Sequence, residues 1–258
     1  MNITRAVIIA LEVLQATTLL EQVRTHITRD VEVFRAVNAT LAMSLVVDTL
    51  PLYTRHLIAH GRQTHMQIGN AEMLACLLSH VQVWSGIKPG ETILVLEEDA
   101  RIDHVSALRL EALAADLEGV KWDFVRVSSG QLIDTGGVEH IGAVAARCAD
   151  GHACWSWGTR GYVIQFEGAR QLLKVADPAI VQVDALISLA AAYTPFQLYW
   201  STLEIAYPTT WRASTVFDGC IIRCFLDEWV LFLVGCCVCV AVFRNHRIWS
   251  PFVKRASW

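Results

Sequence analysis

Apolar residues recur along the start of the chain with two different periods, which predict two kinds of secondary structure. Residues 5–11 form a short apolar run that is typical of a strand, and residues 31–37 return to a strand pattern. Between them, the apolar positions of residues 16–28 have the spacing of an amphipathic helix. We therefore expect the chain to open with a β-α-β unit.

The same alternation continues through the middle of the chain. Residues 71–84 place leucine, valine and tryptophan at helical intervals, and a Lys-Pro-Gly turn at 88–90 leads into the apolar run 92–96. Residues 105–117 carry leucines at helical spacing, and residues 122–127 have the composition of a further strand. Each strand pattern is thus followed by a helix pattern or preceded by one.

A last strand and helix are predicted at residues 161–164 and 167–175, with Pro178 limiting the helix. Strands that alternate with helices indicate an α/β fold with a mainly parallel central sheet. Ligands of such folds bind beyond the carboxyl ends of the strands. Because no repeat or linker interrupts residues 1–218, we predict one domain there.

The end of the chain, residues 219–258, has a different character. Residues 229–243 carry no charge, Trp229 and Phe243 stand at their ends, and basic residues follow. As a helix, this run would be only about 22 Å long, which is short for a bilayer core. We interpret residues 219–258 as a hydrophobic tail with a candidate transmembrane helix at 229–243. The alternative is a buried helix or strand of the main domain.

Insertion of this run would make the protein membrane-associated, and a cytoplasmic location is expected otherwise. The apolar stretch at residues 6–11 is shorter than the apolar region of a secretory signal, so no signal peptide is expected. The basic flank of the tail favours a cytoplasmic end, which would put the main domain across the membrane. A missing signal peptide favours the opposite, so the orientation stays open.

Composition excludes two classes of protein. The 258 residues are 54% hydrophobic and 18% charged, with a mean hydropathy of +0.40, which excludes a disordered chain. The formal net charge of −4 gives no basic surface for nucleic acid. The eight cysteines include no Cys-x-x-Cys pair, so we expect packing roles for most of them rather than a zinc site or a disulfide scaffold.

The strand predicted at residues 92–96 runs into three acidic residues, Glu97, Glu98 and Asp99. Carboxylates directly after an apolar strand are costly unless they are solvated, paired or bound to a cation. In extended backbone, Glu97 and Asp99 would face one side and Glu98 the other. Two explanations stay open, a solvated strand end and a site for Mn²⁺ or Mg²⁺ that binds a nucleotide diphosphate. A metal there would neutralise charge on a departing diphosphate, which suits sugar transfer from a nucleotide sugar.

Several motifs in the right order give the chain a resemblance to a known family. A C-x-x-S-H-x-x-x-W element spans residues 76–84, and Glu97-Glu98-Asp99 follows in the place of an L-E-D-D element. Later come a Trp-Asp pair at 122–123, a G-x-x-x-Y-x-I-x-x-x-G-A-x-x-L-L element that begins at residue 158, and a Val-Asp pair at 183–184. Over roughly residues 5–218, the chain resembles glycosyltransferase family 25, the lipopolysaccharide and procollagen-type β-galactosyltransferases.

The resemblance implies a GT-A-like nucleotide-diphosphosugar transferase fold. It also implies an inverting transfer of a sugar, commonly galactose from UDP-galactose, to a hydroxyl of a glycan or glycoconjugate. A divalent metal, Mn²⁺ or Mg²⁺, would then be held by Asp99, with Glu97 as a ligand or a partner of the ligand. The donor-binding residues that the resemblance suggests are His80, Glu98, Gly161 and Tyr162.

The resemblance also makes Asp184 the candidate for the base that takes the proton of the acceptor hydroxyl, or for a group that orients the acceptor. The alternative for Asp184 is an N-cap ahead of a helix over residues 185–192. For His80 the alternative is a hydrogen-bonded core residue. Gly161 and Gly168 are expected to allow close backbone approach, with ordinary turn roles as the alternative.

Two departures from the family pattern leave a second hypothesis open. Glu98 stands where the family usually has Asp, and the N-x-x-x-R-x-x-R run after the first strand is absent. A catalytically inactive, membrane-tethered relative that acts as a binding protein would tolerate both changes. A P-loop or Rossmann enzyme is disfavoured because the chain has neither glycine fingerprint.

Overall fold

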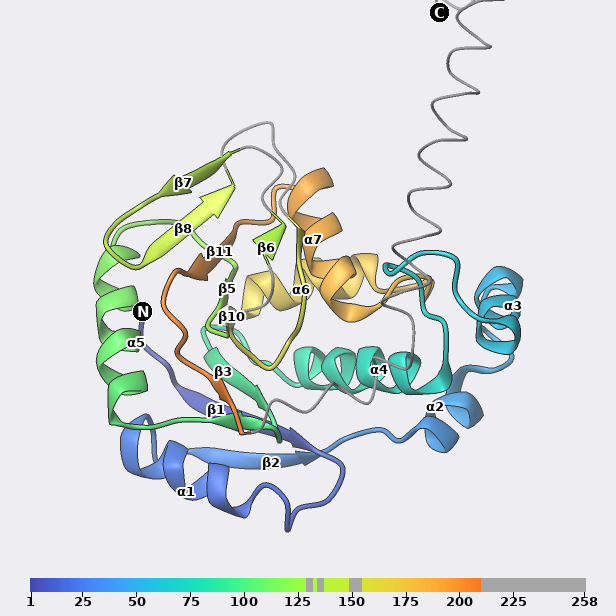
Figure 1. Ribbon diagram of the computed structural model, residues 1–258, viewed down its shortest axis with the longest axis horizontal. Helices are drawn as coiled ribbons and strands as arrows, with labels where there is room; N and C mark the ends of the chain where they lie inside the picture. Colours follow the sequence, from blue (N-terminus) through green and yellow to red (C-terminus); the bar gives the residue numbers. More distant parts are fainter. Residues whose placement is uncertain (129–131, 134–136, 149–154, 210–258) are drawn as a thin grey trace, which may run out of the picture. The chain divides into compact units, whose positions relative to one another are not determined.

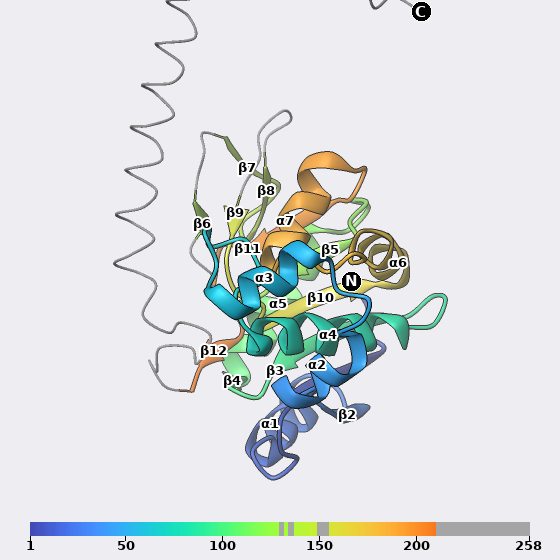
Figure 2. The same cartoon turned by 90° about the vertical axis from the view of Figure 1, so that its right-hand side faces the viewer.

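The computed structural model describes residues 1–128, 132–133, 137–148 and 155–209. Apart from Gln63–His65, these residues belong to one compact unit, in which helices lie on both faces of a central sheet (Figures 1 and 2). The helices are α1 (Thr17–His26), α2 (Ala39–Val46), α3 (Leu52–His60), α4 (Ala71–Ser85), α5 (His104–Asp116), α6 (Phe166–Val175) and α7 (Val183–Tyr193). The strands are β1 (Arg5–Ala10), β2 (Val31–Arg35), β3 (Thr92–Glu97), β4 (Ala100–Arg101), β5 (Phe124–Arg126), β6 (Leu132–Ile133), β7 (Val138–His140), β8 (Ala145–Cys148), β9 (Trp155–Ser156), β10 (Gly161–Gln165), β11 (Leu198–Ser201) and β12 (Tyr207–Pro208).

The largest sheet in the described part of the chain has eight strands in the order β2-β1-β3-β10-β5-β11-β8-β7. β1 pairs in parallel with β2 and β3, and β5 pairs in parallel with β11. β10 is antiparallel to both of its neighbours, and so is β8. The α/β fold is confirmed, but the sheet is mixed, so the expectation of a mainly parallel sheet holds only in part.

The reversed direction of β10 follows from the segment that precedes it. β2, β3 and β5 are each reached through at least one helix, and a helical connection allows the crossover that parallel neighbours need. In contrast, the described residues between β5 and β10 hold only the short strands β6 to β9. β10 can therefore return directly beside β5, where Tyr162 is paired with Arg126.

The elements expected from the hydrophobic pattern are present, with bounds that differ by a few residues. β1, α1 and β2 form the expected β-α-β opening, and α4, β3, α5, β5, β10 and α6 occupy the other predicted stretches. A helix also begins close to the predicted residues 185–192, although α7 starts at Val183.

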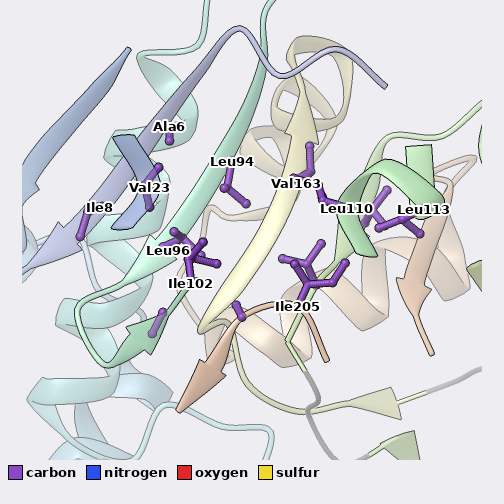
Figure 3. Close-up of a cluster of buried hydrophobic side chains, with 14 of the residues drawn as sticks. Ala6, Ile8, Val23, Leu94, Leu96, Ile102, Leu110, Leu113, Val163 and Ile205 are labelled. Atoms are coloured by element: carbon purple, nitrogen blue, oxygen red, sulfur yellow. The ribbon is translucent and has the colours of Figure 1, made fainter. Parts of the chain in front are cut away.

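A large hydrophobic core lies between the sheet and the helices α1 and α5 (Figure 3). Residues of alternate positions on the central strands build it together with leucine and valine side chains of the two helices. Its members include Ala6, Ile8, Val23, Leu94, Leu96, Leu110, Leu113 and Val163. The intervening residues, such as Ile9 and Val95, are also buried and face the other side of the sheet. Burial on both faces explains the uninterrupted apolar runs at β1 and β3.

The predicted hydrophobic tail, with its candidate transmembrane helix at 229–243, lies outside the described residues. Among the helices that the structure does describe, none combines the length and the apolar character needed to cross a bilayer. Cys148 is disulfide-bonded, so at least one cysteine has a role other than packing, while the expectation for most of the cysteines stays a prediction. Cys76, on α4, is a free thiol.

Two glycines confirm the expected close packing. A Cβ atom at Gly161 would lie 2.6 Å from Cβ of Ala206, and a Cβ atom at Gly168 would lie 2.3 Å from the backbone oxygen of Asp123. Separations below 3 Å are not tolerated between such atoms, so the chain must move if either glycine is enlarged.

We predict that Gly168→Ala lowers the free energy of unfolding by about 1–3 kcal/mol, because α6 must shift away from the backbone of Asp123. Urea unfolding followed by circular dichroism measures the loss. The control is Gly86→Ala, since a Cβ atom at Gly86 would meet its nearest neighbour at an ordinary 3.5 Å. Equal losses in the two variants would contradict the packing explanation.

Candidate functional site

The three acidic residues after β3 have separate partners. β3 ends at Glu97, and Glu98 and Asp99 form a turn that leads into β4. Oε2 of Glu98 accepts a backbone N–H just beyond β1, at 2.9 Å. Oδ2 of Asp99 accepts a hydrogen bond from Nε of Arg160, at 3.2 Å. We expected Glu97 and Asp99 to face the same side, as in extended backbone. This expectation is wrong, because the backbone is no longer extended after Glu97. We call residues 97–99 the acidic turn.

Like charges crowd the acidic turn. Burial raises the pKa of Asp99, and the charge of Glu97 raises it further, while Arg160 acts in the opposite direction. Burial and the charges of Asp99 and Glu97 also raise the pKa of Glu98. A carboxylate whose pKa is raised by a neighbouring negative charge favours a bound cation, and its hard oxygen atoms suit Mn²⁺ or Mg²⁺.

The Asp99 side chain is 52% exposed. However, Glu98 and Asp99 have separate partners. In the described part of the chain, the ligand atoms that lie within 4.8 Å of one another join Glu97 to Cys76 and His80. The metal role of Asp99 and Glu97 therefore stays a prediction.

Two buried side chains form hydrogen bonds with Glu97. Its Oε1 atom lies 3.3 Å from Nε2 of His80 and accepts a hydrogen bond from the Thr159 hydroxyl at 2.5 Å. Burial raises the pKa of Glu97, but these two hydrogen bonds and the charge of Arg160 outweigh it and hold the pKa below its usual value. An ionised carboxylate only accepts hydrogen bonds, so His80 donates its Nε2–H to Glu97.

A chain of hydrogen bonds continues behind His80. Nδ1 of His80 lies 2.8 Å from the Tyr162 hydroxyl, which also accepts the Nε1–H of Trp84 at 2.9 Å. His80 and Trp84 stand one turn apart on α4, and Tyr162 lies on β10. All three are at most 1% exposed. Because buried polar groups are stable only when they are paired, this network fixes the position of Glu97.

The two residues before β10 join the network to the acidic turn. Thr159 binds the carboxylate of Glu97 and Arg160 binds that of Asp99. The backbone adds a third link, because the Glu97 N–H donates to the Arg160 carbonyl at 2.8 Å. Residues 158–160, which we call the clamp loop, therefore set the geometry of the acidic turn.

Asp184 contacts the clamp loop from the other side. It lies in the first turn of α7, with Gln182 as the N-cap, so the alternative that Asp184 caps the helix is wrong. Its carboxylate accepts the backbone N–H of Gly158 at 3.0 Å and that of Ala185 at 2.8 Å. The residue is 8% exposed. Its role as the base, or as an orienting group for the acceptor, stays a prediction.

Arg126 on β5 is a buried charge that the sequence patterns did not single out. Its guanidinium donates to the carbonyl oxygens of Gly158 and Asp184, and the residue is only 2% exposed. Its Nε atom has no hydrogen-bond partner within the described residues. Burial lowers the pKa of Arg126 to about 10, although the charge of Asp184 opposes this, so the side chain remains charged at neutral pH. The feature of the sequence that could have identified Arg126 is a single cationic residue between Val125 and Val127, in an otherwise apolar strand.

The residues expected to bind the donor lie at different depths. His80 and Tyr162 are buried behind Glu97, and the Cα atom of Gly161 faces Ala206 in the core. In this arrangement, His80 and Tyr162 would not contact a donor directly and would act on it through Glu97. Glu98 is the member of the donor-binding set that is partly exposed, and the expected metal ligand Asp99 is exposed beside it. The donor-binding and metal roles of these residues stay predictions.

Comparison with known proteins finds distant relatives, while no family model matches the chain. Procollagen galactosyltransferase 1 of Danio rerio is 26% identical over 174 residues, which are 65% of this chain and 27% of the relative. Procollagen galactosyltransferase 1-B of Xenopus laevis is 32% identical over 123 residues, 46% of this chain and 19% of the relative. Procollagen galactosyltransferase 2 of Homo sapiens is 27% identical over 143 residues, 54% of this chain and 21% of the relative.

The matched segment thus spans about a fifth to a quarter of the length of these curated relatives. The similarity supports a glycosyltransferase family for the chain, which confirms the expected family in part.

We predict that Tyr162→Phe lowers the free energy of unfolding by about 1–3 kcal/mol, because it leaves the buried Trp84 Nε1–H without its partner. Urea unfolding at neutral pH measures the loss. Tyr193→Phe is the matched control, since Tyr193 is 80% exposed and the same hydroxyl is removed into solvent. An equal effect of the two substitutions would argue against the network.

Proposed function

We propose that the chain is an inverting, metal-dependent glycosyltransferase. It moves a sugar, most simply galactose, from a UDP-sugar to a hydroxyl of a glycan or glycoconjugate acceptor. The observation that carries the proposal is the acidic turn beyond the carboxyl end of β3, where the carboxylate of Asp99 is exposed beside Arg160. Burial and neighbouring negative charge raise the pKa of Asp99 and that of Glu98 there. The names of the relatives support the reaction and the sugar, and a GT-A-like nucleotide-diphosphosugar transferase fold agrees with the mixed sheet.

Within this proposal, each part of the acidic turn has a distinct role. Asp99 is the principal metal ligand because its carboxylate is the most exposed of the three. Glu97 stays ionised, and its hydrogen bonds with His80 and Thr159 hold it in place beside Asp99. When bound, Mn²⁺ or Mg²⁺ supplies positive charge that stabilises the departing diphosphate. Arg160, already beside Asp99, adds a second positive charge at the same edge.

Asp184 is the proposed base or acceptor-orienting residue. Each of its carboxylate oxygens accepts one backbone N–H, and a carboxylate oxygen has a second lone pair for another donor. An acceptor hydroxyl could use that second position, from which its proton would pass to Asp184 as the new bond forms. Arg126 holds the backbone carbonyls of Gly158 and Asp184, which keeps the base and the clamp loop together.

A second candidate function is a catalytically inactive relative that binds a partner. The observation that favours it is the bond between Glu98 and the backbone after β1, because a side chain with this structural role is less free to serve a donor. In both candidates, attachment to a membrane through residues 229–243 is a proposal that rests on the sequence alone.

Donor transfer tests the proposed function. We expect the purified chain with Mn²⁺ to hydrolyse or transfer sugar from one member of a panel of UDP-sugars, read by mass spectrometry. Asp99→Asn should lower kcat/KM by about 100-fold or more, because the metal provides several kcal/mol of charge stabilisation.

The matched control for this test is Asp30→Asn. Asp30 is exposed and precedes β2, so it lies at the amino ends of the parallel strands β1 and β2, opposite the edge with the acidic turn. Its substitution should leave kcat/KM unchanged. Full activity of Asp99→Asn would remove the metal role, and tight UDP-sugar binding without turnover of any donor would favour the inactive relative.

A further inference from the structure

We infer that Cys76, His80 and Glu97 form a second cation site, behind the acidic turn, that binds a borderline-soft divalent metal such as Zn²⁺. Within the described part of the chain, they are the one group of three or more His, Cys, Asp and Glu residues whose ligand atoms all lie within 4.8 Å of one another. The inference goes beyond the proposed transferase and does not depend on it.

The backbone brings the three ligands together. Cys76 and His80 are four residues apart on α4, so their side chains lie on one face of the helix, one turn apart. Glu97 joins them from the end of β3, with Oε1 at 3.3 Å from Nε2 of His80. In a tetrahedral zinc site with bonds of about 2.0–2.2 Å, nitrogen and oxygen ligands stand roughly 3.3–3.5 Å apart. Nε2 and Oε1 already have this separation.

The donor atoms select the metal. A thiolate, an imidazole and a carboxylate together suit Zn²⁺ or Co²⁺, whereas Mn²⁺ and Mg²⁺ prefer oxygen ligands. The exposed part of the acidic turn offers only oxygen atoms, from Glu98 and Asp99. The two sites therefore differ in ligand chemistry even though Glu97 adjoins both.

The surroundings of the three ligands resemble the outer shell of a metal site. Nδ1 of His80 contacts the Tyr162 hydroxyl, and the Thr159 hydroxyl contacts Glu97. Such contacts orient metal ligands and fix the histidine tautomer. Metal binding through Nε2 requires the imidazole proton on Nδ1, so the Tyr162 hydroxyl, which donates to Nδ1 in the free protein, must turn to accept the Nδ1–H instead.

Binding also has a defined proton balance. The Cys76 thiol is protonated in the free protein, because burial and the charges of Glu97 and Asp184 raise its pKa. One Zn²⁺ ion forms a bond to sulfur, the S–H bond breaks, and one proton leaves to solvent. The same negative charges attract the incoming cation.

Cobalt titration of the full chain tests the site, with Co²⁺ as a spectroscopic stand-in for Zn²⁺. We expect one equivalent to produce a thiolate-to-cobalt charge-transfer band and the strong visible bands of four-coordinate Co²⁺, and Zn²⁺ to remove both. Cys76→Ser should abolish the charge-transfer band and weaken binding by about 10-fold or more. Absence of the band in the wild-type chain would overturn the inference, and so would its full retention in Cys76→Ser.

Two controls make the result specific, and a second measurement covers the case in which the variant does not fold. Replacement of Cys220 and Cys224 by Ser should leave the band intact, because that pair has the same four-residue spacing in the sequence but is not among the three proposed ligands. Asp99→Asn should also keep the band, which separates this site from the transferase metal. If Cys76→Ser fails to fold, alkylation of Cys76 in the wild-type chain, read by peptide mass spectrometry, replaces it. Zn²⁺ should then protect Cys76, and equal labelling with and without Zn²⁺ would overturn the inference.

Discussion

The candidate site depends on the antiparallel pairing of β10 with β3. In this register Gly161 lies opposite Leu96, so the residues just before β10 meet the residues just after Leu96. The clamp loop consequently binds the acidic turn through two side chains and one backbone hydrogen bond. One residue further along β10, Tyr162 reaches His80 on α4. A shift of the register by one residue would turn Tyr162 to the opposite face of the sheet and break this network.

Buried polar side chains bind the backbone of the clamp loop from two sides. The guanidinium of Arg126 and the carboxylate of Asp184 are both almost fully buried, and each binds the backbone of Gly158. Gly158 has a φ of +89°, a conformation that glycine adopts without strain. These two buried charged groups thus position the clamp loop. The proposed chemistry therefore depends on contacts between these side chains and the backbone.

Local patterns were sufficient for most elements but not for the site. The apolar period of α4, β3, α5 and β10 lies within each segment, so the sequence predicts them directly. The neighbours of β10 are set by contacts between distant segments, which is why the expected parallel sheet turned out to be mixed. For the same reason, the sequence suggested Glu97 as a metal ligand or a partner of the ligand but gave no sign of its contact with His80, which arises only when α4 and β3 come together. Arg126 was missed because a hydrophobic pattern treats a single cation in an apolar strand as an exception. The proposed cation site was missed because the cysteine spacing rule considers pairs of cysteines close in sequence, whereas these ligands come from a helix and a strand.

The position of bound Mn²⁺ and UDP tests the central claim, that the acidic turn beyond β3 is the donor site. Crystals of the chain grown with both ligands would show manganese directly by anomalous scattering. We predict a manganese peak within bonding distance of the Asp99 carboxylate, with the UDP diphosphate on the same ion. A manganese peak away from residues 97–99, or UDP bound at another edge of the sheet, would contradict the claim.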